Sequence, residues 1–174
     1  VDKPAETWEE TFPLGNGRIG VIATDGTVRS GSYTAALSGY TVLERPASPL
    51  VTMIESGIAD SDERALAACR SVLADLPEQN IDTLILGCTH YPLLYHLIDD
   101  LTGYRLNLID AGKETAVAAR DYLVENDLLA EREQGSVQAF VTDTAESFAR
   151  LGKEFLGEEL SHVTRLSIEE LNKG

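Results

Sequence analysis

Cys88, Thr89 and His90 are the residues of this sequence whose types and spacing most clearly suggest chemistry. They follow Gly87, which permits a sharp turn after an apolar run that is typical of a buried strand. Pro92 suits the first turn of a helix, and the positive end of that helix would point back toward Cys88. Such surroundings favour a thiolate, and a histidine two residues away can exchange protons with it. The pattern therefore favours a reactive cysteine over a buried structural one accompanied by a surface histidine.

Two other predicted strand ends carry polar residues. Thr24 and Thr27 follow the first predicted strand, where their hydroxyl groups suit either a substrate carboxylate or the cap of the next helix. The segment 110–112, Asp-Ala-Gly, follows a later strand. Ligands of parallel α/β sheets bind beyond the carboxyl ends of the strands. These segments and the Cys88 loop are therefore the candidate site.

The remaining cysteine and histidines suggest no second site. Cys69 shares a predicted helix face with Leu66 and Leu73, so we expect it to be a core residue. His96 and His162 stand alone without the spacing of metal ligands, and no metal site is predicted. Two cysteines in a chain of 174 residues do not indicate a secreted disulfide scaffold.

The formal net charge of −15 argues against nucleic acid and anionic membranes as partners, because both are negatively charged. A small acidic substrate remains compatible with it, since backbone N–H groups can bind an anion locally. Residues 1–12 contain no apolar targeting segment, and no apolar run approaches the roughly 20 residues that span a bilayer. A cytoplasmic protein is predicted.

Strands and helices are expected to alternate along the chain. Predicted strands cover 19–23, 40–43, 83–86, 106–109, 137–141 and 163–166, and predicted helices cover 30–37, 61–76, 93–101, 113–125 and 144–156. A loop is expected at 46–49. This order is typical of βαβ units, so the predicted fold class is α/β, a parallel sheet with helices on both faces.

The run from Ile81 to Leu94, Ile-Asp-Thr-Leu-Ile-Leu-Gly-Cys-Thr-His-Tyr-Pro-Leu-Leu, resembles the second cysteine motif of glutamate racemases, members of the aspartate/glutamate racemase family. The stretches 20–33, 48–57, 108–112, 140–144 and 155–157 resemble the same family in the same order. Related amino-acid racemases usually carry Glu after the Cys-Thr pair. His90 therefore favours the glutamate enzyme.

This resemblance implies a cofactor-independent isomerase that interconverts L- and D-glutamate with two acid–base groups. Cys88 would be the base on the L-glutamate side, with His90 assisting its proton transfer and Glu55 assisting the catalytic groups. Thr89, Thr24 and Thr27 would contact the substrate. The implied role is the supply of D-glutamate for peptidoglycan, and the full-length protein is a candidate homodimer.

The chain also departs from the family pattern. The Asp-Ser-Gly-x-Gly-Gly stretch and the Ala-Cys-Asn-Thr-like motif with the first catalytic cysteine do not occur in it, and mid-helix Cys69 is no substitute. We therefore expect that the N-terminal part is missing. The expected organisation is an irregular start at 1–17, a complete α/β domain at 18–109 carrying Cys88, and the C-terminal part of a second, similar domain at 110–174.

The implied mechanism needs two bases, and this chain carries only one of them. We therefore expect the isolated chain to be incomplete and inactive as a racemase. One alternative is a non-catalytic, truncated racemase-like protein that binds glutamate or a protein partner. A further alternative is a Cys–His hydrolase with Cys88 as nucleophile. The sequence shows no Asn or Asp near His90 that would orient its ring, which counts against the hydrolase.

Overall fold

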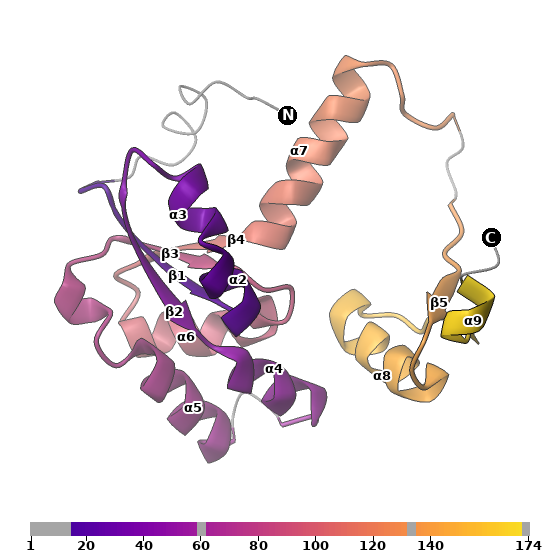
Figure 1. Ribbon diagram of the computed structural model, residues 1–174, viewed down its shortest axis with the longest axis horizontal. Helices are drawn as coiled ribbons and strands as arrows, with labels where there is room; N and C mark the ends of the chain where they lie inside the picture. The colour runs from indigo at the N-terminus through magenta and orange to yellow at the C-terminus, as the bar shows by residue number, and fades with distance from the viewer. Residues whose placement is uncertain (1–14, 59–61, 132–134, 172–174) are drawn as a thin grey trace. The chain divides into compact units, whose positions relative to one another are not determined.

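The computed structural model describes residues 15–58, 62–131 and 135–171 (Figure 1). Its contacts divide the chain into two compact units, with the boundary between Tyr122 and Leu123. Most of the irregular start expected at 1–17 lies outside the described residues. The domain limits expected at 18–109 and 110–174 stay a prediction. The boundary between the two units reflects contacts within the chain alone and does not test those limits.

The first unit is built on a sheet of four parallel strands in the order β2-β1-β3-β4. The strands are β1 (Arg18–Ala23), β2 (Thr41–Pro46), β3 (Thr83–Leu86) and β4 (Asn107–Asp110). All four residues of β3 are buried, as its continuous apolar run predicts. In the register of the central pair, Ile22 lies beside Leu86. The strands predicted at 19–23, 83–86 and 106–109 are confirmed to within one residue at each end.

Helices connect these strands. Between β1 and β2 lie α2 (Asp25–Ser30) and α3 (Ser32–Ala36), and between β2 and β3 lie α4 (Ser48–Glu55), α5 (Glu63–Leu73) and the 3-10 turn η1 (Pro77–Gln79). The 3-10 turn η2 (Tyr91–Leu94) and α6 (Tyr95–Thr102) connect β3 to β4, and α7 (Ala111–Glu125) follows.

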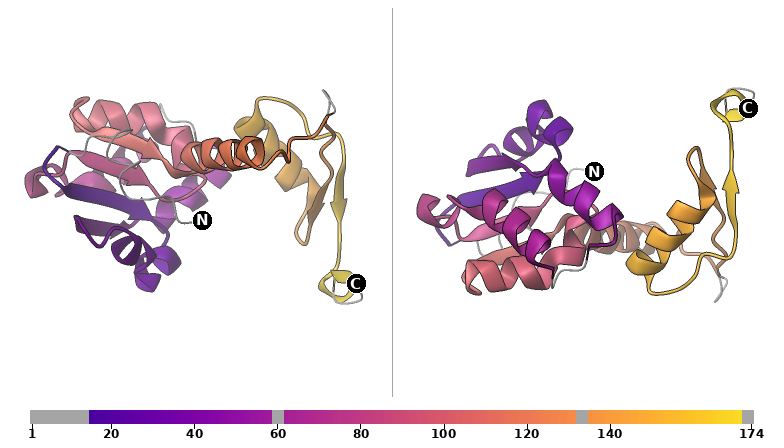
Figure 2. Two further views of the ribbon diagram at one scale, coloured as in Figure 1. Left: turned by 90° about the horizontal axis from the view of Figure 1, so that it is seen from above. Right: turned by 90° about the horizontal axis from the view of Figure 1, so that it is seen from below.

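Each face of the sheet has its own apolar cluster. Ile19, Val21 and Ala23 of β1 point to one side, where they pack with Tyr33 and other residues of α2 and α3. Ile22 points to the other side, into a larger cluster to which α4, α5 and α6 contribute. Figure 2 shows the sheet of this unit between α6 and the α2–α3 pair. The predicted parallel α/β architecture with helices on both faces is confirmed.

Two predicted elements are corrected. The helix predicted at 30–37 is α3 and begins only at Ser32, and the prediction missed α2 before it; Gly31 separates the two, because it adopts a left-handed conformation with φ of 63° and ends α2. The loop expected at 46–49 is in part the start of α4. Pro49 occupies the first turn of that helix, where its missing N–H has no intrahelical partner to lose.

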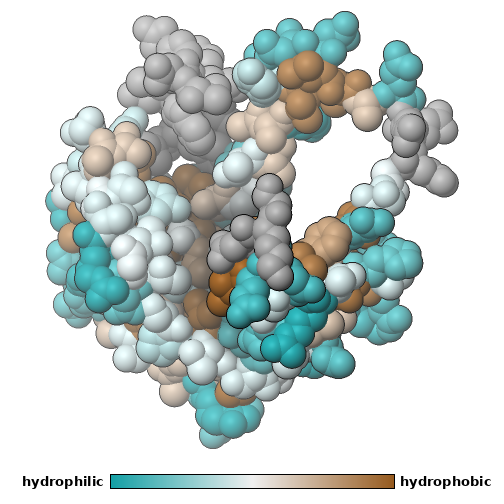
Figure 3. All heavy atoms as spheres, turned by 45° about the vertical axis from the view of Figure 1, so that its right-hand side comes forward, coloured by the Kyte–Doolittle hydropathy of each residue, from teal (hydrophilic) through white to brown (hydrophobic). Residues whose placement is uncertain are grey.

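The second unit contains a single βαβ motif. Parallel strands β5 (Ala139–Val141) and β6 (Val163–Arg165) are joined by α8 (Ala145–Leu156), and α9 (Ile168–Leu171) follows. Within its described residues, Val141 is the one buried hydrophobic side chain. Its exposed large hydrophobic residues are Leu123, Val124, Leu128, Leu129, Val137, Phe140, Phe148, Phe155, Leu156, Ile168 and Leu171. Figure 3 shows apolar, brown residues reaching the surface among hydrophilic ones.

Candidate functional site

The Cys88 loop leaves the sheet at the carboxyl end of β3. The N–H of Gly87 donates to the carbonyl of Ile22 at 2.8 Å, which extends the pairing of β3 with β1 by one residue. A Cβ atom at Gly87 would lie 3.0 Å from the ring and hydroxyl of Tyr33 and 3.1 Å from the Ile22 carbonyl oxygen. Glycine therefore allows a closer approach here than a larger residue would without a shift of its neighbours. Cys88 follows, half-buried and packed against the larger cluster.

The structure brings Cys88, His90 and Glu55 together. Nδ1 of His90 lies 3.8 Å from the Cys88 sulfur, and Nε2 lies 3.0 Å from Oε1 of Glu55, the last residue of α4. Because an ionised carboxylate only accepts hydrogen bonds, Nε2 must carry a proton in this contact. In the neutral ring Nδ1 is then the acceptor, and it faces the thiol. The arrangement can take a proton from Cys88 and stabilise the resulting imidazolium.

Thr89 adjoins this group. Its hydroxyl lies 3.4 Å from Nδ1 of His90, the same ring nitrogen that faces Cys88. The thiol of Cys88 and the hydroxyl of Thr89 both lie near this one nitrogen. A neutral ring can therefore accept a well-aligned hydrogen bond from only one of them at a time. The Thr89 hydroxyl is exposed and is therefore able to turn toward a ligand.

Thr24 and Thr27 lie at the end of β1. The Thr24 hydroxyl accepts from the backbone N–H of Thr27 at 3.5 Å and lies 2.9 Å from the Thr27 hydroxyl, so Thr24 caps α2. The sequence left substrate binding and capping open, and capping is the contact that the structure contains. No hydrogen bond among the described residues joins these threonines to the Cys88 group.

The sheet nevertheless places the Thr24 and Cys88 loops side by side. Because Ile22 pairs with Leu86, Thr24 and Cys88 each lie two residues beyond a paired position on strands about 4.8 Å apart. The chain leaves β1 toward α2 on one face and leaves β3 toward α6 on the other face. This divergence is a topological switch point, the place where open α/β sheets bind ligands.

Sequence reasoning missed two tyrosines near Cys88. Burial raises the pKa of Tyr33, and the charges of Cys88 and then Glu44 raise it further. Burial, followed by the charges of Cys88 and Asp25, holds the pKa of Tyr91 well above its usual range. Tyr91 lies in the recognised motif, but Tyr33 reaches the site only through the packing of α3 against Gly87.

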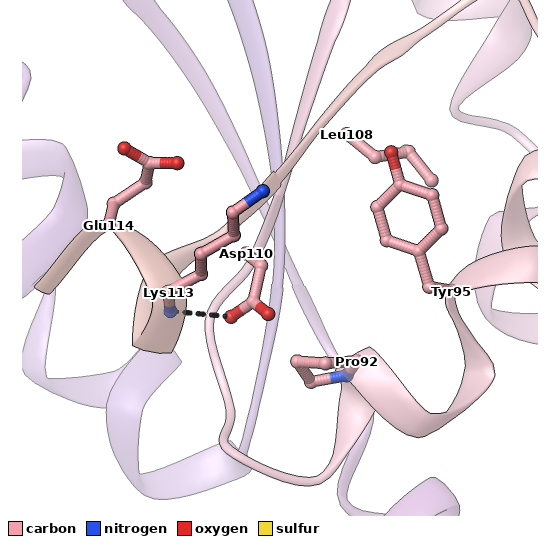
Figure 4. Close-up of a pocket in the computed structure, with 6 residues that line it drawn as sticks. All are labelled: Pro92, Tyr95, Leu108, Asp110, Lys113 and Glu114. Carbon is pink, nitrogen blue, oxygen red and sulfur yellow. Dashed lines mark hydrogen bonds between the residues drawn. The ribbon is translucent and has the colours of Figure 1, made fainter. Parts of the chain in front are cut away.

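A pocket of about 340 Å³ adjoins the Cys88 loop through Pro92 (Figure 4). Asp110, one of its lining residues, accepts hydrogen bonds from the backbone N–H groups of Gly112 at 2.9 Å and Lys113 at 3.1 Å, which caps α7. The lining residues are Pro92, Tyr95, Leu108, Asp110, Lys113 and Glu114. Cys88 is not among them, so the pocket neighbours the reactive group without containing it.

Within the described ranges 15–58, 62–131 and 135–171, no cluster of three or more His, Cys, Asp or Glu residues is arranged to hold a metal ion. None of the helices in these ranges combines the length and apolar character that crossing a bilayer requires.

Comparison with known proteins places these features in one family. A sequence model described as Asp/Glu/Hydantoin racemase matches residues 6–119. The glutamate racemase of Geobacter metallireducens is 39% identical over 159 residues, which cover 88% of this chain and 58% of that protein. The glutamate racemase of Desulforudis audaxviator is 38% identical over 163 residues, covering 87% of this chain and 59% of that protein.

Solved structures agree. The glutamate racemase RacE1 of Bacillus anthracis matches with a TM-score of 0.83 and 31% identity, covering 89% of this chain and 59% of that one. The Francisella tularensis glutamate racemase, solved in complex with D-glutamate, matches with a TM-score of 0.81 and 28% identity, covering 92% of this chain and 60% of that one. The chain thus spans about 60% of the length of these relatives.

Proposed function

From the premise that this chain belongs to the Asp/Glu/Hydantoin racemase family, we propose that it carries the Cys88 side of a glutamate racemase site. The observation that supports this most directly is the contact series from Cys88 through His90 to Glu55. Its ligand is proposed to be glutamate, because a matched relative was solved with D-glutamate. Thr89, Thr24 and Thr27 are the proposed carboxylate contacts.

The proposed step is proton removal from Cα of L-glutamate by the Cys88 thiolate. The Cα–H bond breaks, an S–H bond forms, and the electron pair stays on Cα and the adjoining carboxylate. An α-proton beside a carboxylate is far less acidic than a thiol, so the developing charge needs hydrogen-bond donors and little water. His90 then passes the proton from the thiol toward solvent, with its ring held by Glu55.

Racemisation also needs a proton delivered to the opposite face. Cys69, the other cysteine of the chain, is fully buried in α5. Burial raises its pKa to about 11. A neutral thiol enclosed in the core cannot reach a substrate. The opposite-face group must therefore be something other than a cysteine of these 174 residues, and the chain supplies one wall of the site.

Deuterium exchange tests this proposal. The chain is incubated with L- or D-glutamate in deuterated buffer, and deuterium at Cα is measured by mass spectrometry together with the enantiomer ratio. We expect exchange into L-glutamate with retention of configuration and no sustained formation of D-glutamate. Cys88→Ala should abolish the exchange, whereas Cys69→Ala should not. Exchange no faster than in Cys88→Ala would contradict the proposal.

The contact between His90 and Glu55 also supports a second candidate function, that of a cysteine hydrolase. The sequence offered no Asn or Asp to orient His90, but Glu55 occupies that role at 3.0 Å, so the objection to a cysteine hydrolase does not hold. A Cys–His–carboxylate series can also activate a nucleophile. Accumulation of an acyl-Cys88 adduct with an activated ester, without Cα exchange, would favour the hydrolase over the racemase.

In the cell, we propose that the protein takes part in supplying D-glutamate for peptidoglycan in the cytoplasm, with a homodimer as the proposed assembly of the full-length protein. Family membership and the relatives named as glutamate racemases support the D-glutamate part of this role.

A further inference from the structure

The pocket beside α7 contains charged side chains that the proposed mechanism does not use. It measures about 340 Å³, and its lining comes from η2, α6, β4 and the start of α7, all within the first unit. That volume lies near the lower end of the range for small-molecule sites. Because Cys88 is not part of the lining, a ligand bound here is separate from the racemase reaction.

Asp110 presents a fixed negative charge to this pocket. Its Oδ1 accepts from the backbone N–H groups of Gly112 at 2.9 Å and Lys113 at 3.1 Å. In the part of the chain that the structure describes, its Oδ2 has no hydrogen-bond partner. Because two bonds hold the carboxylate, the second oxygen is positioned before any ligand arrives. A carboxylate oxygen of this kind is well suited to accept from an ammonium group.

Lys113 adds the opposite charge. Its exposed side chain lies with that of Glu114 on the α7 side of the pocket (Figure 4). Within the described residues its ammonium group forms no ion pair, with Asp110 and Glu114 included. A simple amine would be repelled by this group, whereas a ligand with its own carboxylate would pair with it. Two carboxylates against one ammonium group leave the pocket net negative, which disfavours a dicarboxylate such as glutamate.

The opposite side of the pocket is largely apolar. Leu108 is buried, and the half-buried Tyr95 packs with it in the larger apolar cluster. Figure 4 shows Tyr95 and Leu108 across the pocket from Lys113 and Glu114. A ligand that fits both sides has its two charges at one end and an apolar group at the other.

We propose that this pocket binds a neutral α-amino acid with an apolar side chain. The ammonium group of the ligand donates to Oδ2 of Asp110, and its carboxylate pairs with the ammonium group of Lys113. Its side chain lies against Tyr95, Leu108 and Pro92.

An NMR titration with L-valine tests this proposal. Amide spectra of the isotope-labelled chain are recorded at pH 7 with up to about 50 mM L-valine. We expect saturable shifts of the amide signals of Tyr95, Gly112 and Lys113, half complete at roughly 1–10 mM, as for a small ligand with two charged contacts. Isovalerate lacks the ammonium group and isobutylamine lacks the carboxylate. Each should bind at least about ten-fold more weakly than valine.

Two variants with matched controls locate the contacts. Lys113→Met removes the cation, and Lys153→Met in α8 is its control. Asp110→Asn removes the anion but keeps an oxygen that can accept from the backbone. Its control is Asp143→Asn, because Asp143 also accepts a backbone N–H, that of Thr144 at 2.7 Å. We expect valine to bind about ten-fold or more weakly to Lys113→Met and Asp110→Asn, and as in the original chain to both controls.

The proposal is overturned if no saturable shift occurs, or if the shifts are confined to 24–27 and 88–90, which would place valine in the racemase site. Lys113→Met that binds valine as tightly as the original chain would also overturn it, as would equal binding of isovalerate or isobutylamine. Because the titration requires neither glutamate nor Cys88, its result and that of the deuterium-exchange experiment decide separate questions.

Discussion

The two cysteines differ in reactivity because of where each one lies. Cys69 is fully buried, and burial raises the pKa of its thiol from 9.0 to about 11. Cys88 is half-buried beside His90. Iodoacetamide at pH 8 should therefore modify Cys88 and leave Cys69 untouched in the native chain, while both react in urea. Peptide mapping checks this, and early modification of Cys69 would contradict its placement in the core.

The raised pKa of Cys69 also predicts an alkaline loss of stability. Well below pH 9 the thiol is protonated in both states, so its contribution is intact. Between pH 9 and 11 the unfolded chain releases the proton and the folded chain does not, which lowers the free energy of unfolding by about 2–3 kcal/mol. Urea titrations at pH 8 and 10.5 measure this. Cys69→Ala should lose less stability over that interval, and an equal loss would exclude Cys69 as the cause.

Glu55 is expected to act through His90. Glu55→Gln keeps the shape of the side chain but replaces the carboxylate that accepts from Nε2 at 3.0 Å. The ring then loses the charged acceptor that holds its Nε2–H, and we expect Cα exchange to slow by about ten-fold or more, within the range of general acid–base assistance. Glu63→Gln, at the start of α5, is the control. Unchanged exchange in Glu55→Gln would remove Glu55 from the mechanism.

At the scale of elements, the close approach of α3 to the end of β3 depends on Gly87. A methyl group there would meet the Tyr33 ring at 3.0 Å and the Ile22 backbone oxygen at 3.1 Å. Gly87→Ala should therefore destabilise the fold by about 1–3 kcal/mol, the usual cost of overpacking, because backbone cannot yield as a flexible side chain would.

Gly26→Ala is the matched control for that prediction. No atom lies within 4 Å of the corresponding position at Gly26 in α2, and alanine is favoured over glycine in a helix by up to about 1 kcal/mol. Denaturant midpoints of the two variants should move in opposite directions. A Gly87→Ala protein as stable as Gly26→Ala would show that α3 does not pack tightly on β3.

For the whole molecule, burial is unevenly divided between the two units. Apart from Val141, all buried hydrophobic side chains of the described residues belong to the first unit. Hydrogen exchange should therefore be slowest in β1 and β3 and much faster in β5, α8 and β6, because local opening of the second unit exposes little apolar surface. Mass spectrometry of peptic peptides measures both. Equal protection of the two units would contradict this assignment.

The sequence by itself determined the features that depend on neighbouring residues. The continuous apolar run at 83–86 predicts a buried strand without reference to the rest of the sheet. The reactive residue types of the Gly-Cys-Thr-His-Tyr-Pro loop that follows are also neighbours in the sequence. The alternation of strands and helices predicted the α/β class for the same reason. The likeness to glutamate racemases added a role for Glu55, which no local pattern supplies.

Only the tertiary structure decided which distant side chains meet. Glu55 approaches His90 across 35 positions of sequence, Tyr33 covers Gly87, and the Tyr91 hydroxyl is left without a partner among the described residues. The Thr24 hydroxyl likewise contacts the first turn of α2, whose cap it forms. These outcomes depend on how helices from separate crossovers pack against the sheet, and residue spacing carries no information about that packing.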